Sequence, residues 1–352
     1  MPRVRFYFTG LIRCGLAAAT LWLGAPVAAA SPGAVAANRA ATRDSASASL
    51  KIKGVAYTEA RAWFARLGYK AAYDADKQTL TLTSVAGRIV LAVESREASL
   101  HGMRVFLGEP MALHKGALYV ATIDLDRFLG PILRPAKQAP RPLRTIVIDP
   151  GHGGTDTGTQ NKPGKLDEKV FTLDVAKRLQ RLLADSDWKV VLTRTDDRFV
   201  ALPDRAEIAN KAGADLFISI HFNAVANNPA VKGTETYVLT PRFQRSTSSL
   251  LPSAEDKVAQ IGNRHDAWSA VLGAQMHRQL LGKLKTEDRG YKRARFAVLR
   301  LVDCPAVLVE AGYLSNDAEA RKLASESYRG DIAEALAAGI QSYAAALATA
   351  SK

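Results

Sequence analysis

Cysteine is scarce in this chain of 352 residues, which contains only Cys14 and Cys304. Cys14 lies in an N-terminal segment that we expect to be removed, so one cysteine remains and an intramolecular disulfide is excluded. The chain also lacks the motifs of RNA-recognition, helix-turn-helix and zinc-finger proteins, and we expect no nucleic-acid partner. Its formal net charge of +14 favours anionic partners, and polyanionic cell-envelope material suits that charge as well.

The chain has no apolar run that is long enough to cross a bilayer. The apolar segment near the N-terminus runs from about Gly15 to Pro26, whereas a membrane-spanning helix needs about 20 apolar residues. Three arginines precede this segment, and three alanines follow it just before Ser31. This layout predicts a cleaved secretory signal over residues 1–30, with no membrane anchor afterwards. We therefore expect the protein in the periplasm, or secreted to the cell envelope.

The composition changes twice before residue 144. Residues 31–49 are rich in alanine and serine, which predicts a disordered lead-in. Residues 50–134 contain short alternating segments such as 77–84, which are typical of half-buried strands, together with helical patterns. They predict a small α+β domain. The basic, proline-rich residues 135–143 predict a linker.

Apolar strands alternate with amphipathic helices from residue 144 to residue 348. The predicted strands are 144–149, 188–194, 215–224, 234–240 and 306–314, and the predicted helices are 167–186, 203–213, 266–284 and 327–348. This alternation predicts an α/β domain with a mixed, mostly parallel sheet and helices on both faces. In such sheets functional residues gather where the strands end.

Two histidines stand at such strand ends. The stretch "IVIDPGHGGTDTGT", residues 146–159, runs from an apolar strand into a glycine-rich turn that contains His152. His221 likewise follows directly on the apolar residues of the predicted strand 215–224. Either histidine alone would more often have a structural role or lie on the surface. Two histidines at equivalent strand ends are a candidate pair of metal ligands, because the rigid sheet fixes their separation. The turn lacks the Gly-Lys-Ser/Thr ending of a phosphate-binding P-loop.

Two carboxylates complete the candidate site. Catalytic zinc sites usually have three protein ligands and a water, so a third ligand is expected at Glu168, which begins a helix. The alternative is that Glu168, like the adjacent Asp167, only favours the helix N-terminus electrostatically. Glu310 follows a buried apolar run, where a lone carboxylate is costly without compensation. It has a catalytic role beside the metal, or else a salt bridge to Arg289 or Arg300.

Six motifs in order carry a family resemblance: "DPGHGGTDTG", "DEKVFTLDVA", "VVLTRTDD", "ALPDRAEIAN", "SIHFNA" and "PAVLVEAGYLSN". Together they resemble the zinc-dependent N-acetylmuramoyl-L-alanine amidases of bacterial cell-wall turnover, over roughly residues 144–345. The resemblance implies Zn²⁺ ligands at His152, Glu168 and His221 and a catalytic glutamate at Glu310. Thr172 stands where the family commonly carries asparagine.

The resemblance implies an activity and a substrate. The activity is hydrolysis of the amide between N-acetylmuramic acid and L-alanine in peptidoglycan, for cell-wall remodelling or cell separation. Two alternatives are a zinc peptidase that cuts within the stem peptides and a non-catalytic wall-binding protein, although all four expected site residues are present. Residues 50–134 resemble the small domain named after the N-terminal part of copper amine oxidases, without implying copper, and are a spacer or bind the cell wall.

Residues 240–266 are polar, rich in serine and too long for an ordinary connection. Some amidases of this family carry a helix here that covers the zinc until a partner displaces it, so an activator protein is a candidate partner. Few apolar residues are available to hold such a lid shut. Arg242, Arg245 and Lys257 instead suit the carboxylates of stem peptides, and we expect a substrate-facing loop that is not a plug.

Overall fold

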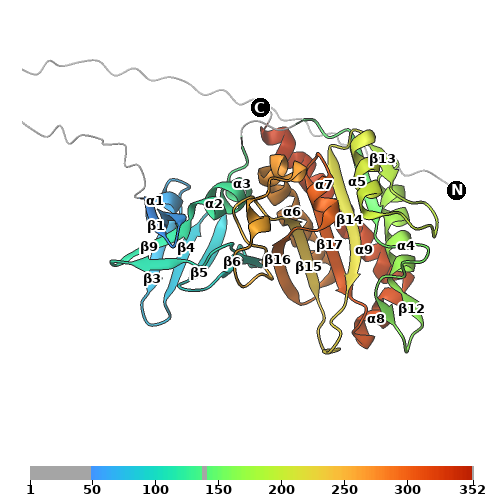
Figure 1. The fold of residues 1–352 in the computed structure, drawn as a ribbon, viewed down its shortest axis with the longest axis horizontal. Helices are drawn as coiled ribbons and strands as arrows, with labels where there is room; N and C mark the ends of the chain where they lie inside the picture. The colour runs from blue at the N-terminus through green and yellow to red at the C-terminus, as the bar shows by residue number, and fades with distance from the viewer. Residues whose placement is uncertain (1–48, 137–140, 351–352) are drawn as a thin grey trace, which may run out of the picture. The chain divides into compact units, whose positions relative to one another are not determined.

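The structure is a computed structural model that describes residues 49–136 and 141–350 (Figure 1). The predicted signal, residues 1–30, lies outside the described residues, as does the predicted lead-in apart from Ser49. Residues 137–140 of the predicted linker also lie outside them. Within the described ranges, no helix combines the length and the apolar character that a membrane span requires.

The first part of the described chain, residues 49–136, forms strands and short helices, as predicted. Its strands are β1 (Ser49–Ile52), β2 (Val55–Glu59), β3 (Lys70–Asp74), β4 (Thr79–Ser84), β5 (Gly87–Ala92), β6 (Glu97–Leu100), β7 (Met103–Phe106), β8 (Ala112–His114) and β9 (Ala117–Ala121), and its helical segments are α1 (Ala60–Ala65), α2 (Thr122–Asp124), η1 (Leu125–Leu129) and α3 (Gly130–Leu133). Strands β3 to β7 pair antiparallel in chain order. Leu80 and Leu82 of β4 are fully buried opposite Leu91 and Ile89 of β5, so the predicted alternation is confirmed.

The second part contains a mixed sheet whose central strands run parallel. Its strands are β10 (Thr145–Pro150), β11 (Gln160–Asn161), β12 (Leu166–Asp167), β13 (Lys189–Leu192), β14 (Leu216–Asn223), β15 (Thr234–Leu239), β16 (Asp288–Ala294) and β17 (Ala306–Tyr313), and its helices are α4 (Glu168–Leu182), α5 (Leu202–Lys211), η2 (Ala254–Lys257), η3 (Ile261–His265), α6 (Asp266–Leu284), α7 (Ala297–Leu301), α8 (Asp317–Ala324) and α9 (Glu326–Ala350). The strand order is β13-β10-β14-β17-β15-β16, and only β17 and β15 pair antiparallel in this series. The predicted mixed, mostly parallel sheet is confirmed.

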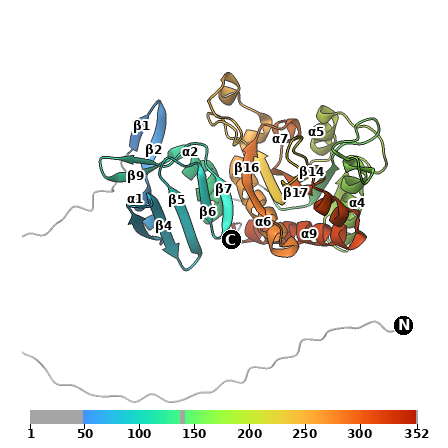
Figure 2. The same ribbon diagram turned by 90° about the horizontal axis from the view of Figure 1, so that it is seen from below.

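Alternate residues of the central strands face two separate layers of helices. Ile146 and Ile148 of β10 belong to the core that includes residues of α4, α6 and α9. Val147 belongs to the other core, with Phe217, Leu308 and residues of α5 and α7. Figure 2 shows α6 and α9 on one side of the sheet and α5 and α7 on the other. Helices therefore cover both faces, as predicted.

The face that packs on α5 and α7 changes character along each strand. In β10 the buried Val147 is followed on the same face by Asp149, and in β17 Leu308 is followed by Glu310. In β14 Phe217 is followed by two polar side chains, Ser219 and His221. Since successive residues on one face are two apart, polar side chains of neighbouring strands meet toward their C-terminal ends.

Strand β16 was not predicted, and it joins the two parts of the chain. Its sequence "DRGYKRA" is rich in charge, so it does not show the apolar run expected of a strand inside a sheet. It nevertheless pairs parallel with β15, and with β7 through Tyr291 and Val105. Beside this junction Arg293 and Asp124, both almost completely buried, form an ion pair of 2.8 Å. One sheet therefore runs through both parts.

We expect Asp124→Asn to destabilise the whole protein, because it leaves the Arg293 guanidinium buried without its carboxylate. Breaking a buried pair in this way costs about 3–5 kcal/mol of unfolding free energy. Urea unfolding followed by circular dichroism measures the loss. The control is Asp74→Asn, whose exposed pair with Lys77 is worth about 0–1 kcal/mol. Equal stability of the two variants would contradict the prediction.

Candidate active site

The glycine-rich turn after β10 holds His152 in a left-handed backbone conformation, with a φ of 62°. This conformation is uncommon for a residue with a side chain and persists only where the surroundings enforce it. A Cβ on Gly151 would lie 2.2 Å from Cε1 of His221, and one on Gly158 would lie 2.6 Å from Cδ2 of His152. Both positions therefore need glycine, because the rings of the two histidines fill the space beside them.

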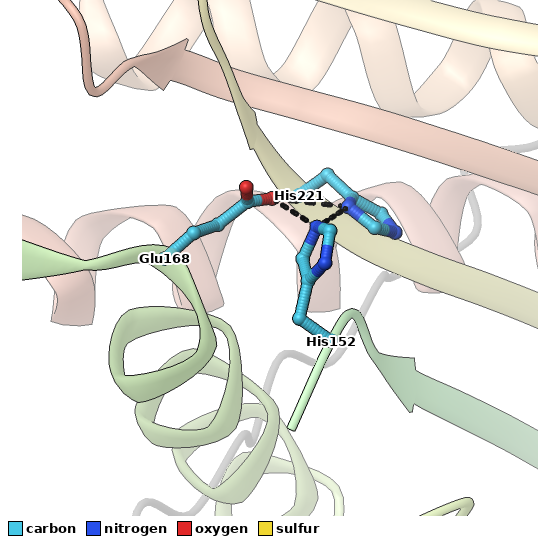
Figure 3. Close-up of side chains that lie close together, drawn as sticks. All are labelled: His152, Glu168 and His221. Atoms are coloured by element: carbon cyan, nitrogen blue, oxygen red, sulfur yellow. Dashed lines mark hydrogen bonds and ion pairs between the residues drawn. The ribbon is translucent and has the colours of Figure 1, made fainter. Parts of the chain in front are cut away.

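Three elements bring the predicted metal ligands together. His152 comes from the turn, Glu168 is the first residue of α4, and His221 lies in β14; their side chains point toward one another (Figure 3). Nε2 of His152 lies 3.1 Å from Oε1 of Glu168, and Nδ1 of His221 lies 3.0 Å from the same oxygen. The two nitrogens are 3.1 Å apart. The donor atoms thus form a nearly equilateral triangle.

Further hydrogen bonds orient two of these donors. Nδ1 of His152 lies 2.9 Å from Oδ2 of Asp156, so the proton of the neutral ring is on Nδ1 and the lone pair of Nε2 faces the cluster. Glu168 accepts from the backbone N–H groups of Thr159, at 2.8 Å, and Phe222, at 2.9 Å. Glu168 is therefore fixed by contacts beyond its own helix, which the purely electrostatic alternative does not require.

The electrostatics of the cluster favour a positive charge at its centre. Burial lowers the pKa of His152, but Glu168 and Asp156 outweigh burial and raise that pKa above its ordinary value. Burial raises the pKa of Glu168, but hydrogen bonds from His152 and His221 outweigh it and hold that pKa below its ordinary value. A proton or a metal cation supplies the charge that this arrangement favours.

The geometry of the donor set fits a zinc ion. Among the residues that the structure describes, His152, Glu168 and His221 are the group of potential ligands whose donor atoms all lie within 4.8 Å of one another. Ligands about 2.0–2.1 Å from a tetrahedral zinc ion are about 3.3 Å apart, close to the 3.0–3.1 Å separations here. Two imidazoles and one carboxylate also leave a fourth position for water.

Glu310 lies next to His221 in the sheet, and Glu235 lies on its other side. Glu310 of β17 is in register with His221 of β14 and with Glu235 of β15. The predicted strands 215–224 and 306–314 agree with β14 and β17, but His221 does not stand at the end of its strand, because β14 continues to Asn223; Glu310 likewise lies inside β17, which continues to Tyr313. The pairing of the two strands shifts its register after His221, so the ladder is irregular directly beside these side chains.

One oxygen of the Glu310 carboxylate, the buried Oε2, lacks a hydrogen-bond partner among the described residues. Arg289, offered above as a salt-bridge partner, contacts Glu235 and Glu287 instead. Burial, together with the charges of Glu168 and Glu235, raises the pKa of Glu310 well above its ordinary value. The residue as a whole is only half-buried and lines the cavity described below, so Glu310 can be reached from there.

Glu235 has the opposite environment. It accepts hydrogen bonds from Nδ2 of Asn223, at 3.0 Å, from the Tyr237 hydroxyl, at 2.7 Å, and from Nζ of Lys292. Burial raises the pKa of Glu235, but Lys292 and the tyrosine hydroxyls outweigh burial and lower it. Of the two adjacent carboxylates, Glu235 is already occupied by donors and Glu310 is not.

The three donors and Glu310 line one cavity of about 350 Å³. Three large apolar side chains also line it and are unusually exposed: Phe199 by 55%, Leu202 by 54% and Phe296 by 39%. Polar groups converging in a cavity with apolar walls are typical of a ligand site. The cavity thus combines reactive groups with a surface for apolar parts of a ligand.

The predicted substrate-facing role of residues 240–266 is not met at this cavity, because none of these described residues lines it. The loop contacts the first part of the chain instead. The Arg96 guanidinium donates to the carbonyls of Ser246, Thr247 and Ser249 at 3.0–3.2 Å. Asp256 forms a salt bridge of 2.8 Å with Arg295. The Arg96 contacts join residues at least 150 apart in sequence, and the Asp256–Arg295 pair joins residues 39 apart, so the local pattern did not reveal them.

Two buried arginines beside the turn were also missed by the sequence analysis. Arg194 is 0% exposed and Arg205 is 2% exposed, and both donate to backbone carbonyls around His152. A signal was present for Arg205, since it lies four residues before Ala209 and therefore on the apolar face of its helix. An arginine on the buried face of a helix needs acceptors inside the protein.

Comparison with known proteins assigns this arrangement to a family. Residues 146–342 match the N-acetylmuramoyl-L-alanine amidase family. The chain belongs to this family. Residues 39–133 match the copper amine oxidase N-terminal domain. Both resemblances inferred from the sequence are thereby confirmed.

Named amidases match the second part of the chain. AmiA of Escherichia coli K12 is 33% identical over 221 residues, which cover 57% of this chain and 76% of AmiA. AmiC of Neisseria meningitidis is 34% identical over 218 residues, which cover 56% of this chain and 52% of AmiC, so the match spans about half of that relative. The crystal structure of an amidase from Clostridium difficile 630 has 33% identity and a TM-score of 0.48, covering 58% of this chain and 97% of the other.

We expect Gly151→Ala to disrupt the donor triangle of this amidase, because the added Cβ would lie 2.2 Å from the His221 ring. Zn²⁺ binding, measured by competition with a chromogenic chelator, should weaken by at least about 10-fold. The control is Gly282→Ala in α6, where a Cβ meets nothing within 4 Å. Unchanged Zn²⁺ affinity in a folded Gly151→Ala variant would show that the His221 position does not matter.

Proposed function

We propose that this protein hydrolyses the amide bond between the lactyl group of N-acetylmuramic acid and the L-alanine of the stem peptide in peptidoglycan. The observation that carries the proposal is a set of four side chains in one cavity: a triangle of donors from His152, Glu168 and His221, and the unpartnered carboxylate of Glu310 beside it. Membership of the amidase family supports the same reaction. The reaction serves cell-wall remodelling or cell separation.

His152, Glu168 and His221 are the proposed ligands of a Zn²⁺ ion, as their donor geometry supports. When bound there, zinc lowers the pKa of a water molecule and polarises the carbonyl of the scissile amide. Asp156 keeps the proton of His152 on Nδ1, and so keeps Nε2 available as a ligand. The backbone N–H groups of Thr159 and Phe222 hold the Glu168 carboxylate in place.

Glu310 is the proposed general base and then the general acid. Its carboxylate, which lines the cavity, takes a proton from the attacking water and passes it to the departing nitrogen of L-alanine. Burial and the nearby carboxylates raise the pKa of Glu310, so that it accepts and holds this proton readily. Glu235 does not compete for this role because three side chains already donate to its carboxylate.

The walls of the cavity suit this substrate. Phe199, Leu202 and Phe296 offer apolar surface on which the methyl groups of the lactyl unit and of alanine, and the apolar face of the sugar, can pack.

Peptidoglycan lies outside the cytoplasmic membrane, and residues 1–30 have the layout of a secretory signal. We therefore place the protein in the periplasm, or in the cell envelope after secretion, with residues 50–134 contributing contacts to the wall.

We expect Glu310→Gln to lose activity by about 10²–10⁴-fold while Zn²⁺ stays bound, since glutamine cannot take the proton from water. Release of new L-alanine amino termini from purified peptidoglycan measures the rate, and metal analysis measures the bound zinc. The matched control is Glu326→Gln, whose side chain is 81% exposed. Near-normal turnover by Glu310→Gln would exclude its role as the base.

Removal of the metal should abolish the reaction. We expect the protein to release intact stem peptides that begin with L-alanine, and to stop when a chelator removes Zn²⁺. Mass spectrometry of the products separates an amidase from a peptidase, because a peptidase leaves L-alanine on the sugar and releases shorter fragments. Activity that persists at full rate in excess chelator would contradict the role of the metal.

A further inference from the structure

Three consecutive backbone carbonyls, those of Pro150, Gly151 and His152, accept hydrogen bonds from two buried guanidinium groups. They belong to the end of β10 and to the turn that presents His152. The guanidinium groups are those of Arg194, which follows β13, and Arg205, which lies in α5. The backbone that carries one candidate ligand is thus held from two other elements of the fold.

Arg194 has no salt bridge within the described residues, and its acceptors are carbonyls and one hydroxyl. It donates to Pro150 O at 3.0 Å, to Gly151 O at 2.8 Å and to Lys169 O at 2.8 Å. It also donates to the hydroxyl of Thr172 at 3.0 Å, and Thr172 in turn donates to Gly151 O at 2.8 Å. Arg194 therefore connects the His152 turn to the first turns of α4, the helix that begins at Glu168.

Arg205 approaches the same turn from the other helix layer. Its Nη1 donates to Pro150 O and to Oδ1 of Asp149, both at 2.8 Å, and its Nη2 donates to His152 O at 2.7 Å. Asp149 is itself fully buried and accepts from the hydroxyls of Thr193 and Ser219. The carbonyl of the strained histidine is therefore attached to a network that includes β10, β14 and α5.

We propose that Arg194 and Arg205 are positioning residues for the metal site: they hold His152 in its left-handed conformation and form the donor triangle before the metal binds. This inference rests on the proposed zinc function of the same site. A left-handed non-glycine residue is kept only where its surroundings over-determine it, and the guanidinium contacts supply that constraint. A planar fork with five donors can hold several carbonyls at fixed angles, which an ammonium group on a flexible chain cannot do.

The test uses Arg194→Lys and Arg205→Lys in the mature full-length protein, because lysine keeps the charge and removes the fork. We expect each variant to bind Zn²⁺ about 10–100-fold more weakly than the wild type in a chelator competition. The visible spectrum of the Co²⁺-loaded protein should also change, because it reports the arrangement of the ligands. The matched control is Arg329→Lys, another buried arginine, whose acceptors, Leu323 O and Oδ2 of Asp174 in α4, lie outside the turn.

A purely structural role predicts a different result. Thermal stability then falls, but the Zn²⁺ affinity of the folded protein stays within about three-fold of wild type and the Co²⁺ spectrum is unchanged. That result overturns the inference. The proposed function fails if the wild type itself binds no Zn²⁺. The inference alone fails if the wild type binds Zn²⁺ and the variants bind it equally well, so the two failures are distinguishable.

A second pair of variants serves if the lysine variants do not fold. Thr172→Val has the same shape but loses the hydroxyl that links Arg194 to Gly151 O, and Thr172→Ser keeps it. We expect the valine variant to bind Zn²⁺ several-fold more weakly and the serine variant to restore the affinity. Equal affinity of both variants, with unchanged Co²⁺ spectra, overturns the inference.

Discussion

The buried ion pair between Asp149 and Arg205 is the contact on which the arrangement of the site depends. Asp149 is the next-to-last residue of β10 and directly precedes Pro150, Gly151 and His152, and Arg205 belongs to a helix on one face of the sheet. Two buried charges are tolerated only when they are paired and their remaining hydrogen-bonding capacity is satisfied. Here the hydroxyls of Thr193 and Ser219 donate further hydrogen bonds to the Asp149 carboxylate. Satisfying this pair therefore fixes the positions of β10, β14 and α5 relative to one another.

The alternation of residues along the strands then decides which side chains meet. The parallel strands β10, β14 and β17 have an apolar residue under α5 or α7 and polar residues two or four positions later on the same face. His221 is in register with Glu310, and Glu310 with Glu235 of the antiparallel β15, which places the three side chains side by side. The cavity lies against this part of the face, and residues of the two helices, such as Leu202 of α5 and Val298 of α7, also line it. The site is thus built where the polar part of the sheet meets this helix layer.

Much of this was predictable from the sequence, because it depends on local periodicity. The range 266–284 coincides with α6, and the strand-end rule placed His152 and His221 close together, as the structure has them. Their roles as ligands, and that of Glu310 as the base, remain predictions. Strand β16 was missed because four of its seven residues are charged, and partners in distant segments neutralise some of those charges, such as Asp124 for Arg293. The contacts of residues 240–266 with the first part of the chain were missed for a similar reason, and the substrate-facing role of this loop remains a prediction.

Two adjacent carboxylates, those of Glu235 and Glu310, differ in their hydrogen bonds and in their pKa because their neighbours differ. Glu235 and Glu310 have the same side chain on the same face of paired strands. Lys292, Tyr237 and Asn223 donate to Glu235, which keeps it charged and uses its oxygens. Because those donors are taken, Glu310 keeps a buried oxygen without a partner in the described chain, beside a second negative charge. A carboxylate in that position gains from accepting a proton, which suits the proposed role of Glu310 as general base.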